Sequence, residues 1–105
     1  MINQKKLQSE YPDLDKYINE NEDIIYYKKD TNIRHNPYGP AVIYKDGGKV
    51  YIIEGVWHRL DGPARIYGYG EVAYYINGSF LTKEEFEVHP ERLKYLGKEY
   101  LICLK

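Results

Sequence analysis

His35-Asn-Pro-Tyr-Gly-Pro-Ala-Val-Ile-Tyr44 returns 23 residues later in the chain, as His58-Arg-Leu-Asp-Gly-Pro-Ala-Arg-Ile-Tyr67. The match continues beyond these two stretches, because Tyr51 aligns with Tyr74 and Gly55 aligns with Gly78 at the same offset. A period of this length is typical of a supersecondary unit that a chain uses more than once. The sequence therefore predicts a structural repeat of about 23 residues.

Each repeat has the pattern of a β-hairpin. Asn77-Gly78 is a strong hairpin signal, since both positions of such a turn need a positive φ. The Gly39-Pro40 and Gly62-Pro63 pairs mark the start of the first strand in each repeat, because proline lacks an amide donor and is tolerated at that position. Residues 24–27 are predicted to be the second half of a truncated repeat. The predicted strands of the two full repeats span residues 41–44, 49–53, 64–67 and 71–76.

The two ends of the chain differ from the repeats and are predicted to cap them. Residues 1–23 form an acidic arm, predicted to be helical because Pro12 suits a first helical turn and Asp13 and Asp15 favour its positive end. Residues 82–105 open with the capping box Thr82-Lys-Glu-Glu85 and are predicted to form helices. A closing strand is predicted over 99–104, with a continued helix as the alternative for so short a run.

The predicted fold class is therefore β-rich α+β, in which stacked antiparallel hairpins at 24–81 form a twisted sheet between two helical caps. With 105 residues, the whole chain, 1–105, is predicted to be a single domain. Strand alternation places Tyr51, Ile53, Tyr74 and Ile76 on the face that repeats strictly, which is expected to be the core. The other face is expected either to lie under the terminal helices or to meet a partner.

Composition narrows the class of protein further. The formal net charge is −1, far from the strongly basic balance that by itself indicates nucleic-acid binding. The single cysteine, Cys103, rules out an intramolecular disulfide and fits a reducing, cytoplasmic compartment. No segment reaches the roughly 20 apolar residues needed to cross a bilayer, so no membrane partner is expected. Tyrosine is the outlier, with 13 copies against two Phe and one Trp.

The run from Gly55 to Gly78, with its His-Arg-Leu-Asp-Gly-Pro-Ala element, resembles the MORN-repeat superfamily. It is most similar to the divergent His-Arg-x-Asp-Gly-Pro-Ala type found in phage and bacterial proteins, and the resemblance covers residues 24–81. Asn36-Pro-Tyr38 stands where that type has Arg-x-Asp. The resemblance implies hairpins stacked into an elongated sheet that acts as a scaffold or binding surface, without shared catalytic residues.

His35 and His58 are the candidate catalytic pair, because two imidazoles near arginines could carry out the acid and base steps of RNA cleavage. Their recurrence at one point of each repeat favours a structural role instead. The same argument assigns structural roles to the recurring residues Gly39, Pro40, Gly62 and Pro63 and to Asp61, which is expected to bond local turn amides. No metal site and no cofactor are predicted, since the His and Cys spacings match no known ligand set.

The main functional signal is a combination of aromatic and basic residues in the repeats. Such residues stack on bases and bind phosphates, but they are also enriched in protein interfaces, and the near-neutral charge favours a protein or ribonucleoprotein partner over RNA alone. Open sheet edges also allow a homodimer. The predicted partner-binding residues are Tyr44, Lys45, Lys49, Trp57, Arg59, Arg65, Tyr67, Tyr69 and Tyr75.

The sequence therefore predicts a non-enzymatic binding protein. Because the proteins it resembles include short phage proteins, the narrower hypothesis is an inhibitor or modulator of a bacterial defence complex, similar in role to an anti-CRISPR protein. Two alternatives stay open. One is an RNA-binding or RNA-cleaving protein that uses the tyrosines and arginines with His35 and His58, and the other is a structural scaffold module of the MORN-like type.

Overall fold

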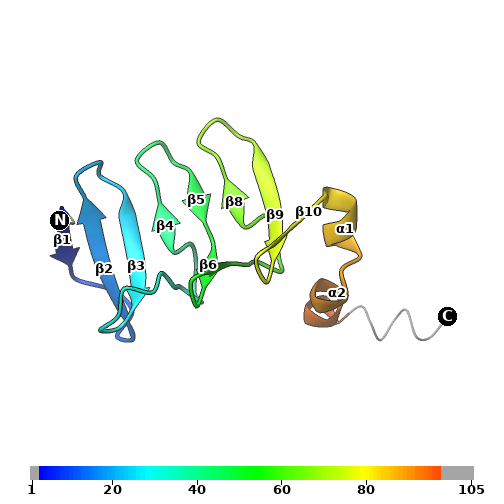
Figure 1. Cartoon of the computed structure of the whole chain (residues 1–105), viewed down its shortest axis with the longest axis horizontal. Coiled ribbons are helices and arrows are strands. Elements are labelled where there is room, and N and C mark those ends of the chain that lie inside the picture. Colours follow the sequence, from blue (N-terminus) through cyan, green and yellow to red (C-terminus); the bar gives the residue numbers. More distant parts are fainter. Residues whose placement is uncertain (1–2, 98–105) are drawn as a thin grey trace.

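A computed structural model describes residues 3–97 as an elongated body of 55 × 31 × 21 Å (Figure 1). Over these residues the chain forms ten strands and two helices. Eight strands make one antiparallel sheet in the order β1-β2-β3-β4-β5-β8-β9-β10, and β6 and β7 form a separate pair. The strands are β1 Gln4–Leu7, β2 Leu14–Asn19, β3 Ile24–Lys28, β4 Val42–Ile43, β5 Lys49–Val50, β6 Ile52–Ile53, β7 Val56–Trp57, β8 Arg65–Ile66, β9 Val72–Ile76 and β10 Ser79–Leu81. The β-rich fold class is thus confirmed.

The hairpin turns follow the predicted chemistry, although the strands are shorter than predicted. Asn77 and Gly78 have φ values of 52° and 82°, and Glu54 and Gly55 have 52° and 80°. These positive values give the tight turns that connect β9 to β10 and β6 to β7. The predicted strand over 49–53 is interrupted at Tyr51, so that β5 pairs with β8 while β6 pairs with β7.

Both helices lie at the C-terminal end of the sheet, as predicted. Thr82 caps α1 (Lys83–Glu87) through the reciprocal capping box with Glu85. His89 caps α2 (Pro90–Leu96), and Gly97 ends it with a φ of 75°. Neither helix of the described chain is long and apolar enough to cross a membrane. The predicted strand over 99–104 and Cys103 lie outside the described residues.

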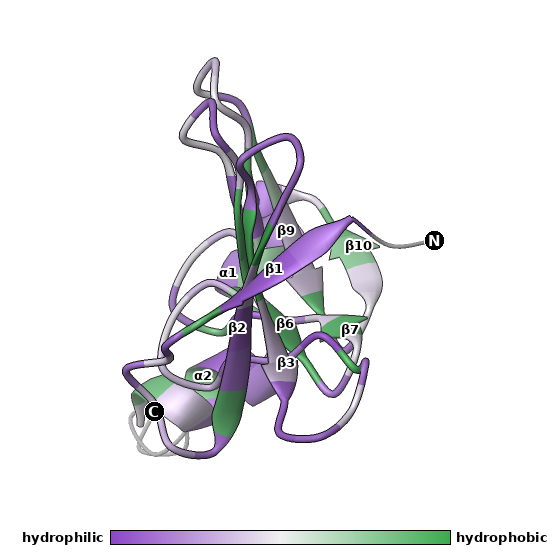
Figure 2. Cartoon of the chain, turned by 90° about the vertical axis from the view of Figure 1, so that its left-hand side faces the viewer, coloured by the Kyte–Doolittle hydropathy of each residue, from purple (hydrophilic) through white to green (hydrophobic). Residues whose placement is uncertain are grey.

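The predicted N-terminal helix is wrong, because its residues form β1 and β2 instead. β2 pairs with β1 on one side and with β3 on the other, so its backbone is satisfied by neighbouring strands and not within a helix. Asp15 is buried there and accepts a hydrogen bond from the Asp30 amide at 2.8 Å. The neighbouring strand β3 is rich in β-branched and aromatic residues, and pairing with it outweighs the local helix signals of Pro12 and Asp13. Figure 2 looks at the molecule from this end and shows β1 as a hydrophilic edge.

The core corrects the predicted assignment of faces. Its buried cluster is formed by Ile25, Tyr27, Ala41, Val42, Val50 and Ile52. Val50 and Ile52 belong to the face expected to be covered by helices or by a partner. Tyr51 and Ile53, from the strictly repeating face, are only half-buried, although Ile76 from that face is fully buried. Helix α1 packs on the strictly repeating face at β9, where 4.6 Å separates the ring centroids of Phe86 and Tyr74.

Candidate binding surface

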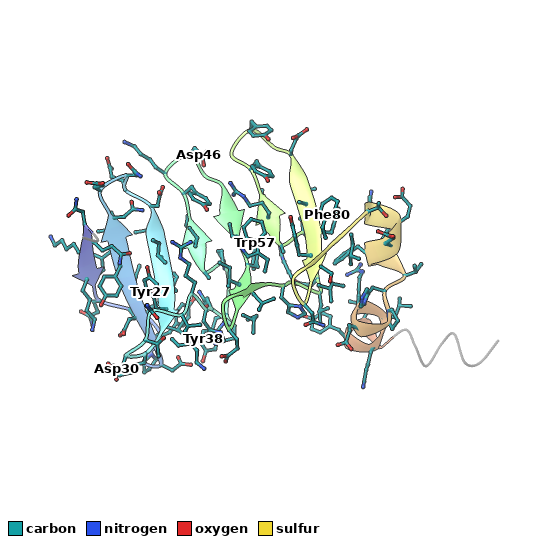
Figure 3. All side chains as sticks on the ribbon, in the orientation of Figure 1. Tyr27, Asp30, Tyr38, Asp46, Trp57 and Phe80 are labelled. Atoms are coloured by element: carbon teal, nitrogen blue, oxygen red, sulfur yellow. The ribbon has the colours of Figure 1, made fainter. Side chains whose placement is uncertain are left out.

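Cross-strand pairing gathers aromatic side chains on the face of the sheet that carries Val50 and Ile52. Ile52 is opposite Trp57, and Tyr75 is opposite Phe80. Residues that are directly opposite in an antiparallel pair lie on the same face. The Trp57 ring meets the Tyr75 ring edge-on at 5.0 Å, and Tyr75 meets Phe80 at 5.5 Å. Figure 3 labels Trp57 and Phe80 along this part of the sheet.

A second aromatic group lies on the same face, nearer the β4–β5 and β8–β9 turns. The guanidinium carbon of Arg65 lies 4.6 Å from the centroid of the Tyr44 ring and 4.1 Å from that of Tyr67. Arg65 also donates to the carbonyl of Ile66 at 2.9 Å, which fixes the guanidinium plane. The Tyr69 ring lies 5.4 Å from Tyr67 at the tip of the turn. Both cation–π contacts hold these side chains in place.

We call this set the aromatic face and define it by Tyr44, Trp57, Arg65, Tyr67, Tyr69, Tyr75 and Phe80. Its most exposed members are Tyr69, with 73% of its surface accessible, and Phe80, with 64%. Tyrosine, tryptophan and arginine are the residues that contribute most to binding energy in protein interfaces. Six of the seven were predicted from the sequence. Phe80 was missed, although its place after the Asn77-Gly78 turn sets it opposite Tyr75.

Three predicted binding residues lie elsewhere. The ammonium of Lys45 forms an ion pair with Glu22 at 2.9 Å, beyond the edge of the aromatic face. Lys49 donates weakly to the Gly47 carbonyl at 3.4 Å, and strand alternation from Val50 turns it toward the opposite face. Arg59 also lies on the opposite face. The structure therefore places these three predicted binding residues away from the aromatic face.

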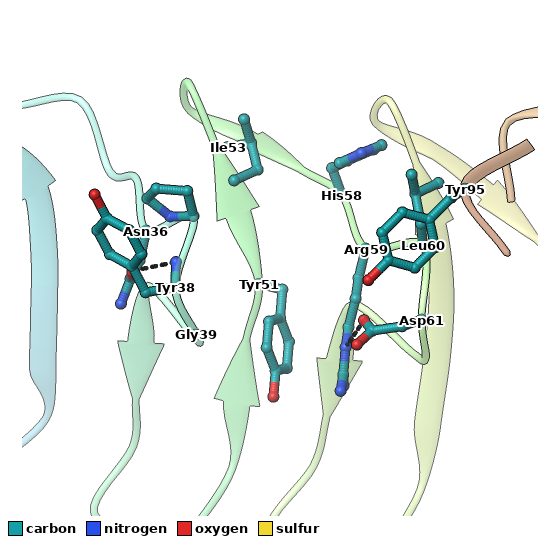
Figure 4. A pocket seen from close by; sticks show the side chains of 11 residues that line it. Asn36, Tyr38, Gly39, Tyr51, Ile53, His58, Arg59, Leu60, Asp61 and Tyr95 are labelled. Carbon is teal, nitrogen blue, oxygen red and sulfur yellow. Dashed lines mark hydrogen bonds and ion pairs between the residues drawn. The ribbon is translucent and has the colours of Figure 1, made fainter.

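Arg59 belongs to a hollow of about 250 Å³ on the opposite face (Figure 4). Its guanidinium carbon lies 3.9 Å from the centroid of the Tyr51 ring. Its nitrogens donate to Asp61 at 2.9 Å and to the Pro63 carbonyl at 3.1 Å. Asp61 thus binds an arginine side chain and not the turn amides that were expected. These contacts hold Arg59 within the protein, which gives it a structural role in the loop that precedes β8.

The two candidate catalytic histidines each bind a backbone amide. The Nδ1 atom of His35 accepts from the Glu54 amide at 2.8 Å, and that of His58 accepts from the Asn77 amide at 2.9 Å. Burial lowers the pKa of His58, against the opposing effect of Glu91. Each imidazole therefore satisfies a turn amide through the nitrogen that would otherwise be free to act as a base.

The described residues 3–97 contain no group of three or more His, Cys, Asp or Glu side chains placed to hold a metal ion. Comparisons with protein-family models, with curated proteins and with solved structures find no match to this chain. The resemblance to MORN repeats therefore stays a prediction from the sequence.

Proposed function

We propose that this protein acts by binding a macromolecular partner through the aromatic face, and not by catalysis. The observation that supports the proposal most is the Arg65 guanidinium between the rings of Tyr44 and Tyr67. Side chains fixed in this way lose little conformational entropy when a partner binds. The exposed rings of Tyr69 and Phe80 add apolar area that the described part of the chain leaves open to solvent.

A protein is a more favourable partner than a nucleic acid alone, whether it is a free protein or the protein part of a ribonucleoprotein. Nucleic-acid binding needs cations that are free to contact phosphates. Here Lys28 forms an ion pair with Glu54 at 2.8 Å, and Lys45 is paired with Glu22. The net charge of −1 offers no general attraction to a polyanion. These charges favour a partner that is recognised through aromatic and apolar contacts.

We further propose that the sheet is a short array of hairpin repeats of the MORN-like type, which serves to present this surface. Equivalent hydrogen bonds at the predicted period support the proposal. The Gly55 amide donates to the Arg34 carbonyl at 2.9 Å, and the Gly78 amide donates to the Trp57 carbonyl at the same distance. Asn36 donates to the Pro40 carbonyl at 3.0 Å, as Arg59 does to that of Pro63. Asn36 thus replaces the arginine of the resembling sequences in this contact.

Dimerisation through the edge of β1 is less favourable than binding at the aromatic face. β1 ends the sheet and carries Lys5 and Lys6. Two copies paired along β1 would bring these lysines near their counterparts, and like charges across a strand pair are destabilising. Lysines on an edge strand are also a common device against edge-to-edge association.

The proposal is tested by affinity capture from bacterial lysate, with and without RNase, using the wild-type chain and the variants Tyr69→Ser and Phe80→Ser. Both side chains are exposed, so the variants are expected to fold. We expect a protein that survives RNase treatment and is lost with both variants. If it is a subunit of a defence complex, the narrower hypothesis of an anti-CRISPR-like inhibitor gains support. Capture of RNA alone, or capture unchanged by both variants, would contradict binding of a protein through this face.

A further inference from the structure

Three equivalent positions form a row across the aromatic-face side of the sheet. Tyr27 forms a bridge opposite Arg34, in the same way that Ile52 is opposite Trp57 and Tyr75 is opposite Phe80. Because Tyr27 and Ile52 belong to one buried cluster, Arg34 points to the same side as Trp57. The row therefore runs from a cation, Arg34, to two aromatic rings.

Hollows lie on both sides of Arg34. One, of about 450 Å³, lies between Arg34 and Trp57 and has Ile33 and Ile52 among its walls. The other, of about 230 Å³, lies toward the N-terminal end and includes Tyr27 and Gln4. Both hollows include Arg34, so its side chain separates the recess beside Trp57 from a smaller one that is lined mostly by amide and carboxylate side chains. Ile33 is itself exposed, with 39% of its surface accessible.

Arg34 differs from the other arginines in its contacts. Arg59 binds Asp61 and stacks on Tyr51, and Arg65 lies between two rings. Arg92 donates to the Leu60 carbonyl at 2.7 Å and packs on Phe86. Arg34 is exposed, and its guanidinium makes no ion pair or hydrogen bond with any residue in the described range 3–97.

We propose that Arg34 and the recess beside Trp57 form a binding site for a protein segment that carries a carboxylate next to an apolar side chain. The guanidinium would bind the carboxylate through two parallel hydrogen bonds, the geometry that arginine favours. The neighbouring apolar side chain would occupy the recess walled by Ile33, Ile52 and Trp57. This inference rests on the proposed function and names the chemistry of its partner.

The charges around Arg34 favour a carboxylate on a protein over the phosphates of RNA. Glu54 lies in the wall of the larger recess, and Glu20 lies in that of the smaller one. Glu54 is already paired with Lys28, and Glu20 lies on the other side of Arg34, so a phosphate chain that carries a charge at every residue would meet a single guanidinium with no surplus of positive charge around it. A segment with one compact carboxylate can reach Arg34 and place uncharged groups near the glutamates.

The experiment selects binding peptides from a random display library against the full-length protein, and then measures the affinity of the best peptide for variants. We expect enrichment of sequences in which Asp or Glu lies within two residues of Phe, Trp, Leu or Ile. Arg34→Gln should weaken binding at least about tenfold, because a hydrogen bond to a charged group is worth about 1.5–3 kcal/mol. Lys83→Gln is the matched control, since it removes the same charge from α1 and should leave the affinity unchanged.

Three results would overturn the inference. The first is a selection without acidic and apolar enrichment, and the second is a peptide whose affinity is the same for Arg34→Gln and the wild type. The third is binding of a homopolymeric RNA, polyuridylate, that is lost with Arg34→Gln, which would make the recess a nucleic-acid site. If lysate capture is lost with Phe80→Ser but kept with Arg34→Gln, the proposed function stands and this inference alone fails.

Discussion

The Nδ1 atom of His58 lies 2.9 Å from the backbone nitrogen of Asn77 and accepts its hydrogen bond. This contact fixes the start of the turn between β9 and β10. His58→Leu should lower the free energy of unfolding by about 0.5–1.5 kcal/mol, the net contribution of one hydrogen bond. His58→Asn offers a side-chain oxygen and should restore part of the loss. Urea denaturation followed by circular dichroism measures both, and equal stability of the Leu and Asn variants would contradict this role.

The same histidine predicts a dependence of stability on pH. Burial lowers the pKa of His58 in the folded protein, so between that value and the unfolded value of about 6.5 the unfolded chain binds more protons. This contribution is fully present above about pH 6.5 and is lost as the pH falls toward the folded pKa. We expect the free energy of unfolding to decrease from pH 7.5 to pH 5.5, and to decrease less in His58→Asn. An identical slope in both proteins would contradict the assignment.

Gly39 and Gly62 occupy equivalent positions but have different surroundings. A Cβ atom at Gly62 would lie 3.0 Å from the guanidinium carbon of Arg59, which is held by Tyr51, Asp61 and Pro63, whereas a Cβ at Gly39 would meet nothing within 4 Å. Gly62→Ala should therefore lower the melting temperature. Gly39→Ala should leave it unchanged or raise it, because alanine restricts the unfolded chain. Equal effects of the two variants in thermal unfolding would show that Arg59 moves aside freely.

Arg65 should stabilise the aromatic face through its shape as well as its charge. Arg65→Lys keeps the charge but loses the planar group that lies between Tyr44 and Tyr67, so we expect a loss of about 1 kcal/mol in the free energy of unfolding. Lys45→Ala removes an exposed ion pair and should change the free energy by less than about 0.5 kcal/mol. Chemical denaturation compares the two, and full stability of Arg65→Lys would contradict the stacking argument.

The sequence predicted the parts of the fold that local chemistry specifies. Asn77-Gly78 requires positive φ, Thr82 and Glu85 form a reciprocal cap, and Gly97 ends a helix, and all three are found. It failed at the N-terminus, where Leu14–Asn19 has helix signals but forms a strand through pairing with β1 and β3. In so short a segment, long-range strand pairing is not accompanied by a periodic sequence pattern from which the strand could be predicted.

The candidate surface was predicted less completely than the fold. Residue type alone grouped Arg59 with Arg65, but they lie on opposite faces of the sheet, where Arg59 stacks on Tyr51 and Arg65 stacks on Tyr67. Arg34 was not singled out because its equivalents in the repeat are Trp57 and Phe80, so no shared residue type marks the position. The row appears only when the cross-strand register is known.

The most direct test of binding through the aromatic face is site-specific photocrosslinking in bacterial cells. Benzoylphenylalanine is placed at Phe80 on the aromatic face or, as a control, at Tyr95 on α2, two positions with similar exposure of 64% and 58%. Crosslinked products are then identified by mass spectrometry. We expect one discrete protein adduct from position 80 and none from position 95. Adducts of the same partner from position 95 alone, or no adduct from position 80, would contradict the central claim.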